Sequence, residues 1–290
     1  MPGFFVGNNF VCHYCTLNTM PELPEVETTR AGIAPHVEGK RIKALTIRQR
    51  SLRWPVEPDI EAQVEGQVIG ELWRRGKYLL IPSGHKNLMI HLGMSGSLRI
   101  VDADEPPGYH DHFDILLHDR TCLRYRDPRR FGSLHLLDNP PLSHALLSHL
   151  GPEPLAEDFT AEFIYAKAKG RKIAVKPFLM DSKVVVGVGN IYATEALFMA
   201  GISPSRSAGR ISLARYAKLV DAVKEILAAA IQRGGTTLRD FVGGDGNAGY
   251  FANELSVYGR DGKPCVVCQT PLELSQLGQR ATVFCKSCQR

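Results

Sequence analysis

The spacing of apolar residues is most regular over residues 211–232, where it predicts a long amphipathic helix. The repeating positions are Leu213, Tyr216, Val220, Val223, Leu227 and Ile231. Ser212 suits the N-cap of this helix, and Gly234-Gly235 ends it. A stripe of this kind is typical of a helix packed on a core. Shorter patterns predict helices over 161–169, 172–179 and 190–200, and an early helix from Pro24 to about Pro35.

Short β-rich segments occupy the region between the early helix and the later ones. They cover residues 41–48, 66–73, 78–81, 88–91, 97–101, 113–118, 121–125 and 132–137, separated by Gly, Asp and Pro. Turn-forming residues at near-regular intervals favour an antiparallel sandwich or barrel. Helices dominate after Asn139-Pro140-Pro141. We therefore predict an α+β fold, with a leading helix, an N-terminal antiparallel β-sandwich and a helical C-terminal domain.

Length and charge narrow the class of protein only slightly. A chain of 290 residues can bury a large core and is long enough for two domains. Its net charge of +5 and isoelectric point near 8.8 permit a nucleic-acid partner without demonstrating one. No apolar run approaches the length of a membrane span, so we expect no membrane partner.

Four of the seven cysteines lie in two pairs near the C-terminus, with the pattern Cys265-x2-Cys268-x16-Cys285-x2-Cys288. This spacing matches a tetrahedral zinc site, in which four thiolates leave no open position for a catalytic water. We therefore expect one structural Zn²⁺ that holds a β-hairpin together. Clustered cysteines also favour a reducing cytoplasm over a disulfide framework.

Residues 1–19 differ from the rest of the chain, since they contain no Lys, Arg, Asp or Glu. They lack the basic region and cleavage site of a signal peptide. We expect either a start codon assigned too early or a segment that is absent from the active form. Cys12 and Cys15 form a CxxC without a second pair nearby, which is only half of a zinc site.

The string Pro21-Glu22-Leu23-Pro24-Glu25 follows this segment directly. If the chain begins at Pro21, its nitrogen is a secondary amine that can attack an aldehyde carbon. Inside a chain the same nitrogen belongs to a tertiary amide and is not basic. By themselves, these residues would be interpreted as the cap of a helix.

PELPEVET resembles the opening of the formamidopyrimidine-DNA glycosylases, and the resemblance covers residues 20–290. It implies a DNA-repair enzyme that removes 8-oxoguanine and formamidopyrimidines from double-stranded DNA, then cleaves the abasic site by β,δ-elimination. It implies that Pro21 is the nucleophile and Glu22 the general acid/base, supported by Glu25. Lys77 and Arg280 would grip phosphates at the same site.

The resemblance also implies a set of DNA contacts. His91 and Asn190 would hold phosphates, and Lys176 would lie near the lesion pocket. Met94, Arg129 and Phe131 would fill the gap left by an everted base, with Arg129 facing the orphaned cytosine. The glycine-rich loop 236–251 would cover that base. Without the resemblance, these residues would be ordinary surface charges and hairpin packing.

The implied domains are a catalytic β-sandwich at 20–138, a helix-two-turn-helix domain at 139–256 and a zinc finger at 257–290, with 1–19 outside the match. We expect a monomer in the bacterial cytoplasm, associated with the nucleoid, whose partner is double-stranded DNA carrying oxidised purines or abasic sites.

Two alternatives stay open at this point. An enzyme similar to endonuclease VIII would prefer oxidised pyrimidines, although Leu23, where that family usually has glycine, argues against it. A protein with an acylated Pro21 would bind damaged DNA through its zinc module without cutting it.

Overall fold

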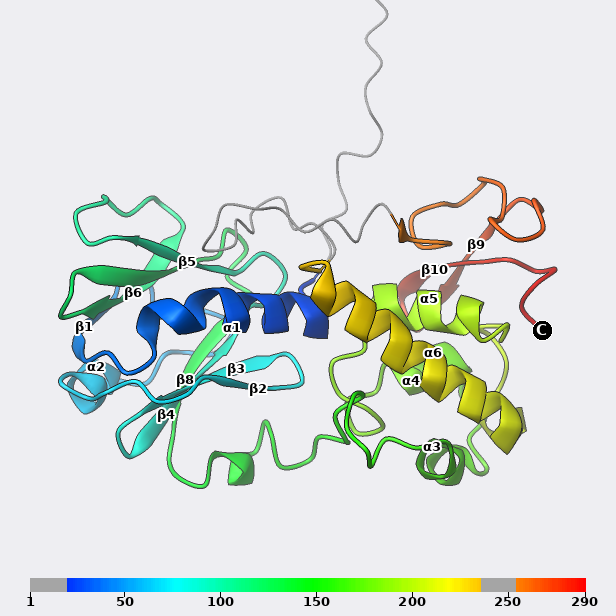
Figure 1. The fold of residues 1–290 in the computed structure, drawn as a ribbon, viewed down its shortest axis with the longest axis horizontal. Coiled ribbons are helices and arrows are strands. Elements are labelled where there is room, and N and C mark those ends of the chain that lie inside the picture. The colour runs from blue at the N-terminus through cyan, green and yellow to red at the C-terminus, as the bar shows by residue number, and fades with distance from the viewer. Residues whose placement is uncertain (1–19, 236–253) are drawn as a thin grey trace, which may run out of the picture.

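The computed structural model describes residues 20–235 and 254–290, which form two lobes side by side (Figure 1). The first lobe holds α1 and eight strands, and the second holds the longer helices of the C-terminal half together with a β-hairpin. The predicted α+β class is therefore confirmed. Loop 236–251 and the Cys12/Cys15 pair lie outside the described residues.

The first lobe is a sandwich of two four-stranded antiparallel sheets. One sheet has the order β1-β6-β7-β5 and the other β2-β3-β4-β8. Their bounds are β1 Ile42–Ile47, β2 Trp73–Arg75, β3 Tyr78–Ser83, β4 Lys86–His91, β5 Ser97–Asp102, β6 Asp111–Leu117, β7 Thr121–Arg126 and β8 Ser133–Leu137. Side chains from both sheets, such as Phe113 and Ile90, meet in one buried core. The spacing of turn residues favoured a sandwich or a barrel, and the sandwich is the one observed.

The predicted strand at 66–73 is wrong. Only Trp73 belongs to a regular strand, while Val68 and Ile69 make isolated bridges to Arg41 and Ser83. The neighbouring position on β3 is Pro82, which accepts a hydrogen bond from Gly70 N but has no N–H to return. A regular ladder therefore cannot extend along this edge.

Helix α1 (Leu23–Val37) begins as predicted and continues past Pro35 to Val37. It buries Val26 and Ile33 against the sandwich core. A short helix, α2 (Ile60–Val64), was not predicted from the sequence; it covers the same core with Ile60 and Val64.

The second lobe contains α3 (Ala161–Ala168), α4 (Val175–Leu179), α5 (Asn190–Met199) and α6 (Leu213–Gln232), with short 3₁₀ turns at Pro141–Ser143 and Ala208–Arg210. The predicted start of α4 at 172 is wrong, because residues 173–175 pair with 206–208 instead.

The stripe predicted on α6 was too narrow. Leu213 is 40% exposed, whereas Leu219, Ala222 and Ile226 are buried along with most of the predicted positions. Helices α3 and α5 both pack on α6, so its buried face is wider than a single stripe.

The C-terminal segment forms the predicted hairpin, with β9 (Glu273–Leu277) paired to β10 (Arg280–Phe284). Gly278 and Gln279 form its tip with φ of 54° and 60°, as a two-residue type I′ turn requires. The hairpin packs beside α5 and shares a small apolar core with Phe198.

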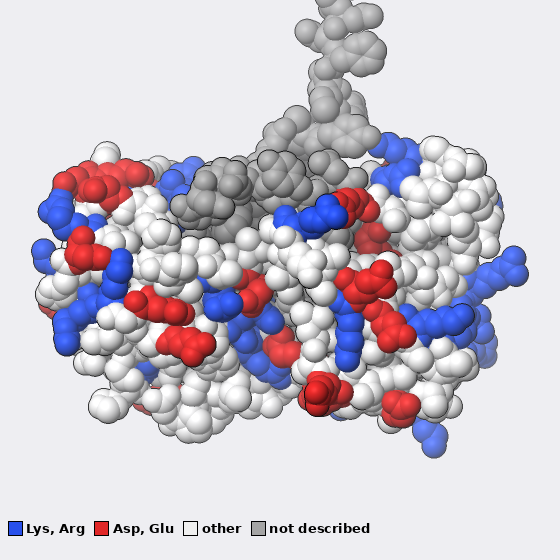
Figure 2. Space-filling view, viewed as in Figure 1, with Lys and Arg blue, Asp and Glu red and all other residues white. Residues whose placement is uncertain are grey.

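Charge is mixed on the face seen in Figure 2, where Lys and Arg are interspersed with Asp and Glu. Within residues 20–235 and 254–290, none of the helices has the length and apolar character needed to cross a bilayer.

Candidate active site and metal centre

Residues far apart in sequence line a single cavity of about 200 Å³ between the lobes. Five predicted site residues take part: Glu22, Lys77, Met94, Asn190 and Arg280. The remaining lining residues are Met20, Met180, Val188, Gly189, Ile191 and Tyr258. The first lobe contributes Lys77 and Met94, and the second contributes Asn190 and Arg280.

Glu22 is almost fully buried and faces the first turn of α5. Its carboxylate accepts hydrogen bonds from the backbone N–H groups of Gly189 (2.8 Å), Ile191 (3.0 Å) and Tyr192 (3.4 Å). Burial raises the pKa of Glu22, while the charge of Lys77 and these donors lower it. A buried carboxyl with a raised pKa, held by backbone donors at a helix N-terminus, can act as a proton donor and acceptor.

Two glycines allow Glu22 and Leu23 to approach the loop before α5. A Cβ on Gly189 would lie 2.3 Å from the Glu22 carboxyl carbon, and one on Gly187 would lie 2.6 Å from the Leu23 side chain. Gly187 also has a φ of +79°, which favours glycine. The Gly187-Val188-Gly189 sequence is therefore a close-contact surface for the start of α1.

Pro21 is buried next to Glu22, and the preceding residue, Met20, lines the cavity. Glu25 fixes the backbone at Glu22 relative to α5, since it accepts hydrogen bonds from Glu22 N (2.9 Å) and the Tyr192 hydroxyl (2.7 Å). The backbone that carries Pro21 and Glu22 is thus tied to α5 by both glutamates.

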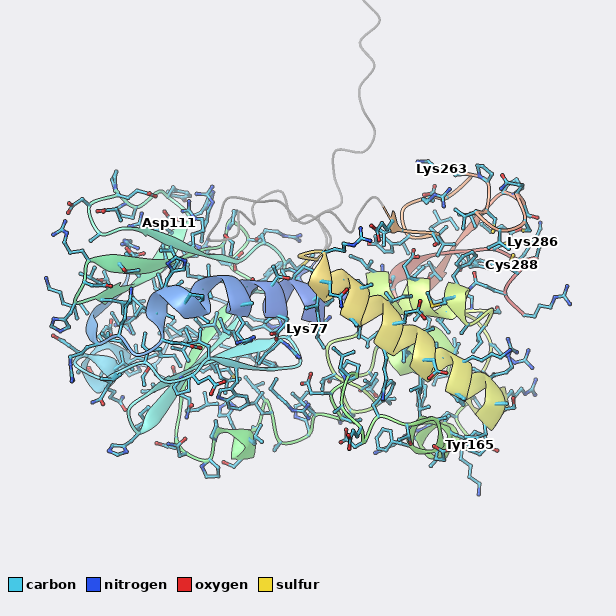
Figure 3. The ribbon with its side chains drawn as sticks, in the orientation of Figure 1. Lys77, Asp111, Tyr165, Lys263, Lys286 and Cys288 are labelled. Atoms are coloured by element: carbon cyan, nitrogen blue, oxygen red, sulfur yellow. The ribbon has the colours of Figure 1, made fainter. Side chains whose placement is uncertain are left out.

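Lys77 sits in the two-residue turn between β2 and β3, at the junction of the lobes (Figure 3). Glu153 of the second lobe fixes the base of this turn. Its carboxylate accepts hydrogen bonds from Arg74 (2.7 Å), Arg75 (3.0 Å) and the backbone N–H of Gly76 (2.7 Å). These bonds fix the turn that brings Lys77 to the cavity also lined by Glu22.

Asn190 and Tyr258 line the cavity from the second lobe. The side-chain oxygen of Asn190 is buried without a hydrogen-bond partner among the described residues. Burial raises the pKa of Tyr258, and a hydrogen bond with the Asn190 side chain that does not involve this oxygen lowers it. Glu195 accepts hydrogen bonds from the N–H groups of Ser256, Val257 and Tyr258, so Tyr258 is anchored on α5.

Arg280 begins β10 directly after the hairpin tip, so the finger delivers its exposed side chain to the cavity. Lys176 does not reach the cavity. It is fully buried beneath β10 and donates to the Ala281 carbonyl (3.0 Å) and the Thr282 hydroxyl (2.8 Å). Burial lowers the pKa of Lys176 to about 8. Direct contact of Lys176 with DNA stays a prediction; the structure places this side chain beneath the strand that carries Arg280.

His91 ends β4, outside the cavity lining, with its ring 5.0 Å from that of Tyr78. Burial lowers the pKa of His91 to about 4, helped by the charges of Lys77 and Arg53. The ring is therefore neutral at neutral pH. Its Nδ1 accepts a hydrogen bond from Gly93 N (3.0 Å), which leaves the Nε2–H as a donor.

Arg129 and Phe131 are exposed on the loop 127–132, and Phe131 is 42% exposed. The Arg129 guanidinium lies over the Phe131 ring, 5.0 Å from its centroid. Met94 comes from the neighbouring loop 92–96 and lines the cavity. The three residues predicted to act together therefore lie on two adjacent loops.

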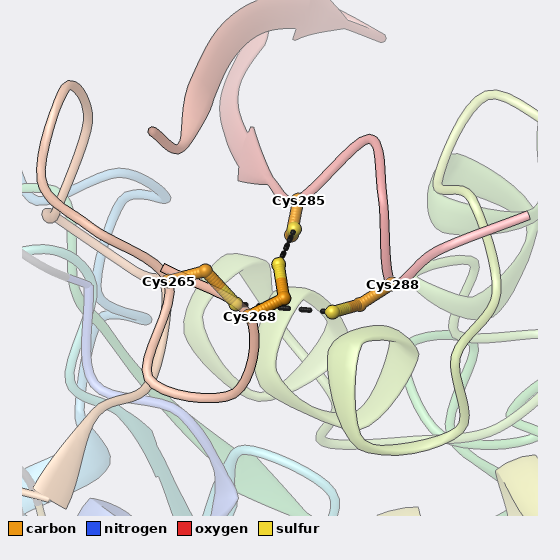
Figure 4. Close-up of side chains that lie close together, drawn as sticks. All are labelled: Cys265, Cys268, Cys285 and Cys288. Carbon is orange, nitrogen blue, oxygen red and sulfur yellow. Dashed lines mark hydrogen bonds between the residues drawn. The ribbon is translucent and has the colours of Figure 1, made fainter. Parts of the chain in front are cut away.

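The four C-terminal cysteines cluster with their Sγ atoms within 4.8 Å of one another (Figure 4). Sulfur–sulfur distances of 3.9 Å (Cys265–Cys288) and 3.4 Å (Cys268–Cys285) are close to the edge of about 3.8 Å expected for a tetrahedron of thiolates 2.3 Å from a zinc ion. All four thiols are free, so the cluster can hold a metal ion.

Comparison with known proteins identifies the family. The model of the formamidopyrimidine-DNA glycosylase N-terminal domain matches residues 20–134, and the model of the H2TH domain of the same enzymes matches residues 150–242. A formamidopyrimidine-DNA glycosylase of Stutzerimonas stutzeri is 58% identical over 271 residues, which is 93% of this chain and 100% of that protein. The chain belongs to the formamidopyrimidine-DNA glycosylase family.

Solved structures of this family have the same fold. The MutM (Fpg) protein from Thermus thermophilus aligns with a TM-score of 0.83 at 39% identity, covering 93% of this chain and 98% of that one. A MutM structure in complex with DNA containing carbocyclic 8-oxo-G aligns with a TM-score of 0.85 at 32% identity, over 93% of this chain and 100% of that one.

Sequence reasoning missed several parts of this glycosylase-family site. The sequence predicted no role for Tyr258 or Met180, both of which line the cavity. Glu153 was missed because a lone glutamate in a connecting segment has no distinctive pattern. The adjacent Arg74-Arg75-Gly76-Lys77 sequence is the one signal that could have suggested an acidic partner.

Proposed function

We propose that this protein is a bifunctional DNA glycosylase and abasic-site lyase that acts on 8-oxoguanine and formamidopyrimidine lesions in duplex DNA. One observation carries the proposal: Glu22, the residue that follows Pro21, lines with its buried carboxyl a cavity that Lys77 and Arg280 also reach from opposite lobes. The names of the relatives and the lesion DNA in their solved complexes support this substrate class.

The nitrogen of Pro21 would be the nucleophile. Its lone pair attacks C1′ of the damaged nucleotide, the bond from C1′ to the base breaks, and the base leaves with a proton. The ammonium then loses its proton, the nitrogen lone pair forms a double bond to C1′ as the C1′–O4′ bond breaks, and O4′ takes up a proton, which gives a ring-opened iminium. That cation accepts electrons when the C2′ proton departs, so the 3′ phosphate and then the 5′ phosphate are eliminated.

Glu22 would move the protons in these steps. Its raised pKa keeps the protonated form accessible, and the three backbone donors stabilise the carboxylate after a proton is given up. Lys77 and Arg280, both at the cavity, would hold the phosphates that flank the abasic sugar. Asn190 and the neutral Nε2–H of His91 would add further contacts to the backbone.

Met94, Arg129 and Phe131 would enter the duplex where the lesion has been everted. Met94 lines the cavity, and on the adjacent loop the Arg129 guanidinium lies over the exposed Phe131 ring. Apolar wedges of this kind stabilise a kinked, unstacked duplex.

The metal is proposed to be one zinc ion bound by Cys265, Cys268, Cys285 and Cys288, in keeping with four thiolates at tetrahedral spacing. Since all four positions are filled by protein, the ion would be structural. It would hold the hairpin that presents Arg280.

The active form is proposed to begin at Pro21. Because Met20 lines the cavity, removal of the residues up to Met20 would leave the imino nitrogen at the cavity wall. A form that retains residues 1–19 should bind abasic duplex without cutting it, since its Pro21 nitrogen is acylated.

The test combines intact-mass measurement with borohydride trapping. A protein whose mass matches Pro21–Arg290 should form a covalent adduct with lesion DNA, and the longer form should not. Full abasic-site cleavage by the longer form would show that another group attacks the sugar.

A further inference from the structure

Both loops that carry the wedge residues cross between the two sheets of the sandwich. Loop 92–96 leaves β4 of one sheet and enters β5 of the other, and loop 127–132 runs from β7 back to β8. They therefore lie at the same end of the sandwich and could in principle move independently.

Asp127 ties the two loops together. Its side chain is completely buried and accepts hydrogen bonds from the Ser95 hydroxyl (2.5 Å), the Gly132 N–H (2.8 Å) and the Tyr125 hydroxyl (3.1 Å). Ser95 comes from the Met94 loop and Gly132 from the Phe131 loop. Because each of these donors is a neutral group, the buried carboxylate is held by hydrogen bonds rather than by an opposite charge.

Ser95 extends this link to Arg129. The Ser95 hydroxyl donates to Asp127 and accepts from the backbone N–H of Arg129 (3.1 Å). The same N–H also lies 3.3 Å from the Asp127 carboxylate. The position of the Arg129 backbone is thus set by a hydroxyl on the loop that carries Met94.

The loop backbones are also in direct contact. A Cβ on Gly93 would lie 2.4 Å from the Gly132 nitrogen, and one on Gly132 would lie 1.7 Å from the Tyr125 hydroxyl. No side chain fits between the loops, so a shift of one would displace the other or break bonds to a buried carboxylate.

We propose that Asp127, acting through Ser95, is a positioning residue that joins the two loops into one rigid wedge and thereby sets the discrimination between bases opposite the lesion. This inference rests on the proposed function. Arg129 can distinguish an opposite base only if its guanidinium is fixed relative to Met94 and Phe131, and the Asp127–Ser95 link is what fixes its backbone.

Three variants test the proposal: Ser95→Ala, Asp127→Asn and the control Asp114→Asn. Asp114 is another buried carboxylate of the same sandwich, bonded to Arg124 (2.9 Å) and Arg48. The measurements are kcat/KM for excision opposite cytosine and opposite adenine, and the rate of nicking of a single-stranded abasic oligonucleotide, which needs no wedge. Borohydride trapping of the wild type tests the proposed function separately.

The ratio of the two kcat/KM values should fall roughly threefold to tenfold in Ser95→Ala, as expected for one lost hydrogen bond. It should fall further in Asp127→Asn, while single-stranded nicking stays within about twofold because neither Ser95 nor Asp127 lines the cavity that holds Glu22 and Lys77. Asp114→Asn should lower Tm and leave the ratio unchanged.

Unchanged ratios in folded Ser95→Ala and Asp127→Asn, or a parallel loss of single-stranded nicking, would overturn the positioning role. A wild type that excises lesions without distinguishing the opposite base would overturn it as well. A wild type that neither excises nor is trapped would instead contradict the proposed function.

Discussion

Replacing Gly189 with alanine tests how the carboxyl of Glu22 is held. The backbone of Gly189 has φ −112° and ψ −155°, which alanine can adopt, so the effect comes from the added methyl group alone. That methyl group would lie 2.3 Å from the Glu22 carboxyl carbon. The side chain must therefore move away from the donors at the start of α5.

The two strongest of these bonds join Glu22 to Gly189 N (2.8 Å) and Ile191 N (3.0 Å). A hydrogen bond to a charged group contributes about 1.5–3 kcal/mol, so losing them should lower the free energy of unfolding by about 2–4 kcal/mol after partial relaxation. A displaced general acid/base should slow lesion excision by about a hundredfold. Binding to duplex with a stable abasic analogue should change little.

Single-turnover excision from an 8-oxoguanine duplex and urea unfolding would check both effects, on protein that begins at Pro21. Gly108→Ala is the matched control, since its added methyl group meets Asp111 at an ordinary 3.4 Å. If Gly189→Ala excises the lesion at the wild-type rate, Glu22 does not act from the position described here.

Three further predictions concern other parts of the site. The pKa of His91 is about 4 in the folded protein against an ordinary 6.5, so only the unfolded chain takes up a proton between these pH values. The free energy of unfolding should therefore fall by about 3 kcal/mol as pH falls from 6.5 to 4. His91→Gln should flatten this part of the curve of unfolding free energy against pH. Cys285→Ser should reduce bound zinc, measured by elemental analysis, and abolish binding to abasic duplex; full binding by a zinc-free protein would contradict the role of the finger. Lys176→Met should lose both hydrogen bonds to β10 and lower the free energy of unfolding by about 2 kcal/mol. It should also weaken binding to abasic duplex, measured by fluorescence titration. Unchanged affinity would show that Arg280 keeps its position without Lys176.

The sequence alone determined those features that depend on neighbouring residues. The period of apolar positions located α6, the spacing of turn residues in the β-rich half predicted an antiparallel sandwich or barrel, and the Cys265–Cys288 spacing predicted the clustered thiols. In each case the cause is local, since a helical face, a turn or a chelating pair is built within a few residues.

Only the tertiary structure decided how the parts of the site meet. Glu22 accepts its hydrogen bonds from residues about 170 positions away, Glu153 fixes the turn of Lys77, and Lys176 is buried under β10 instead of lining the cavity. The narrow predicted stripe on α6 and the strand predicted at 66–73 failed for the same kind of reason, because α3, α5 and Pro82 are distant neighbours that no local pattern reveals. Burying a charged group is stable only where enough donors converge on it, and that convergence depends on how the lobes pack rather than on any single stretch of sequence.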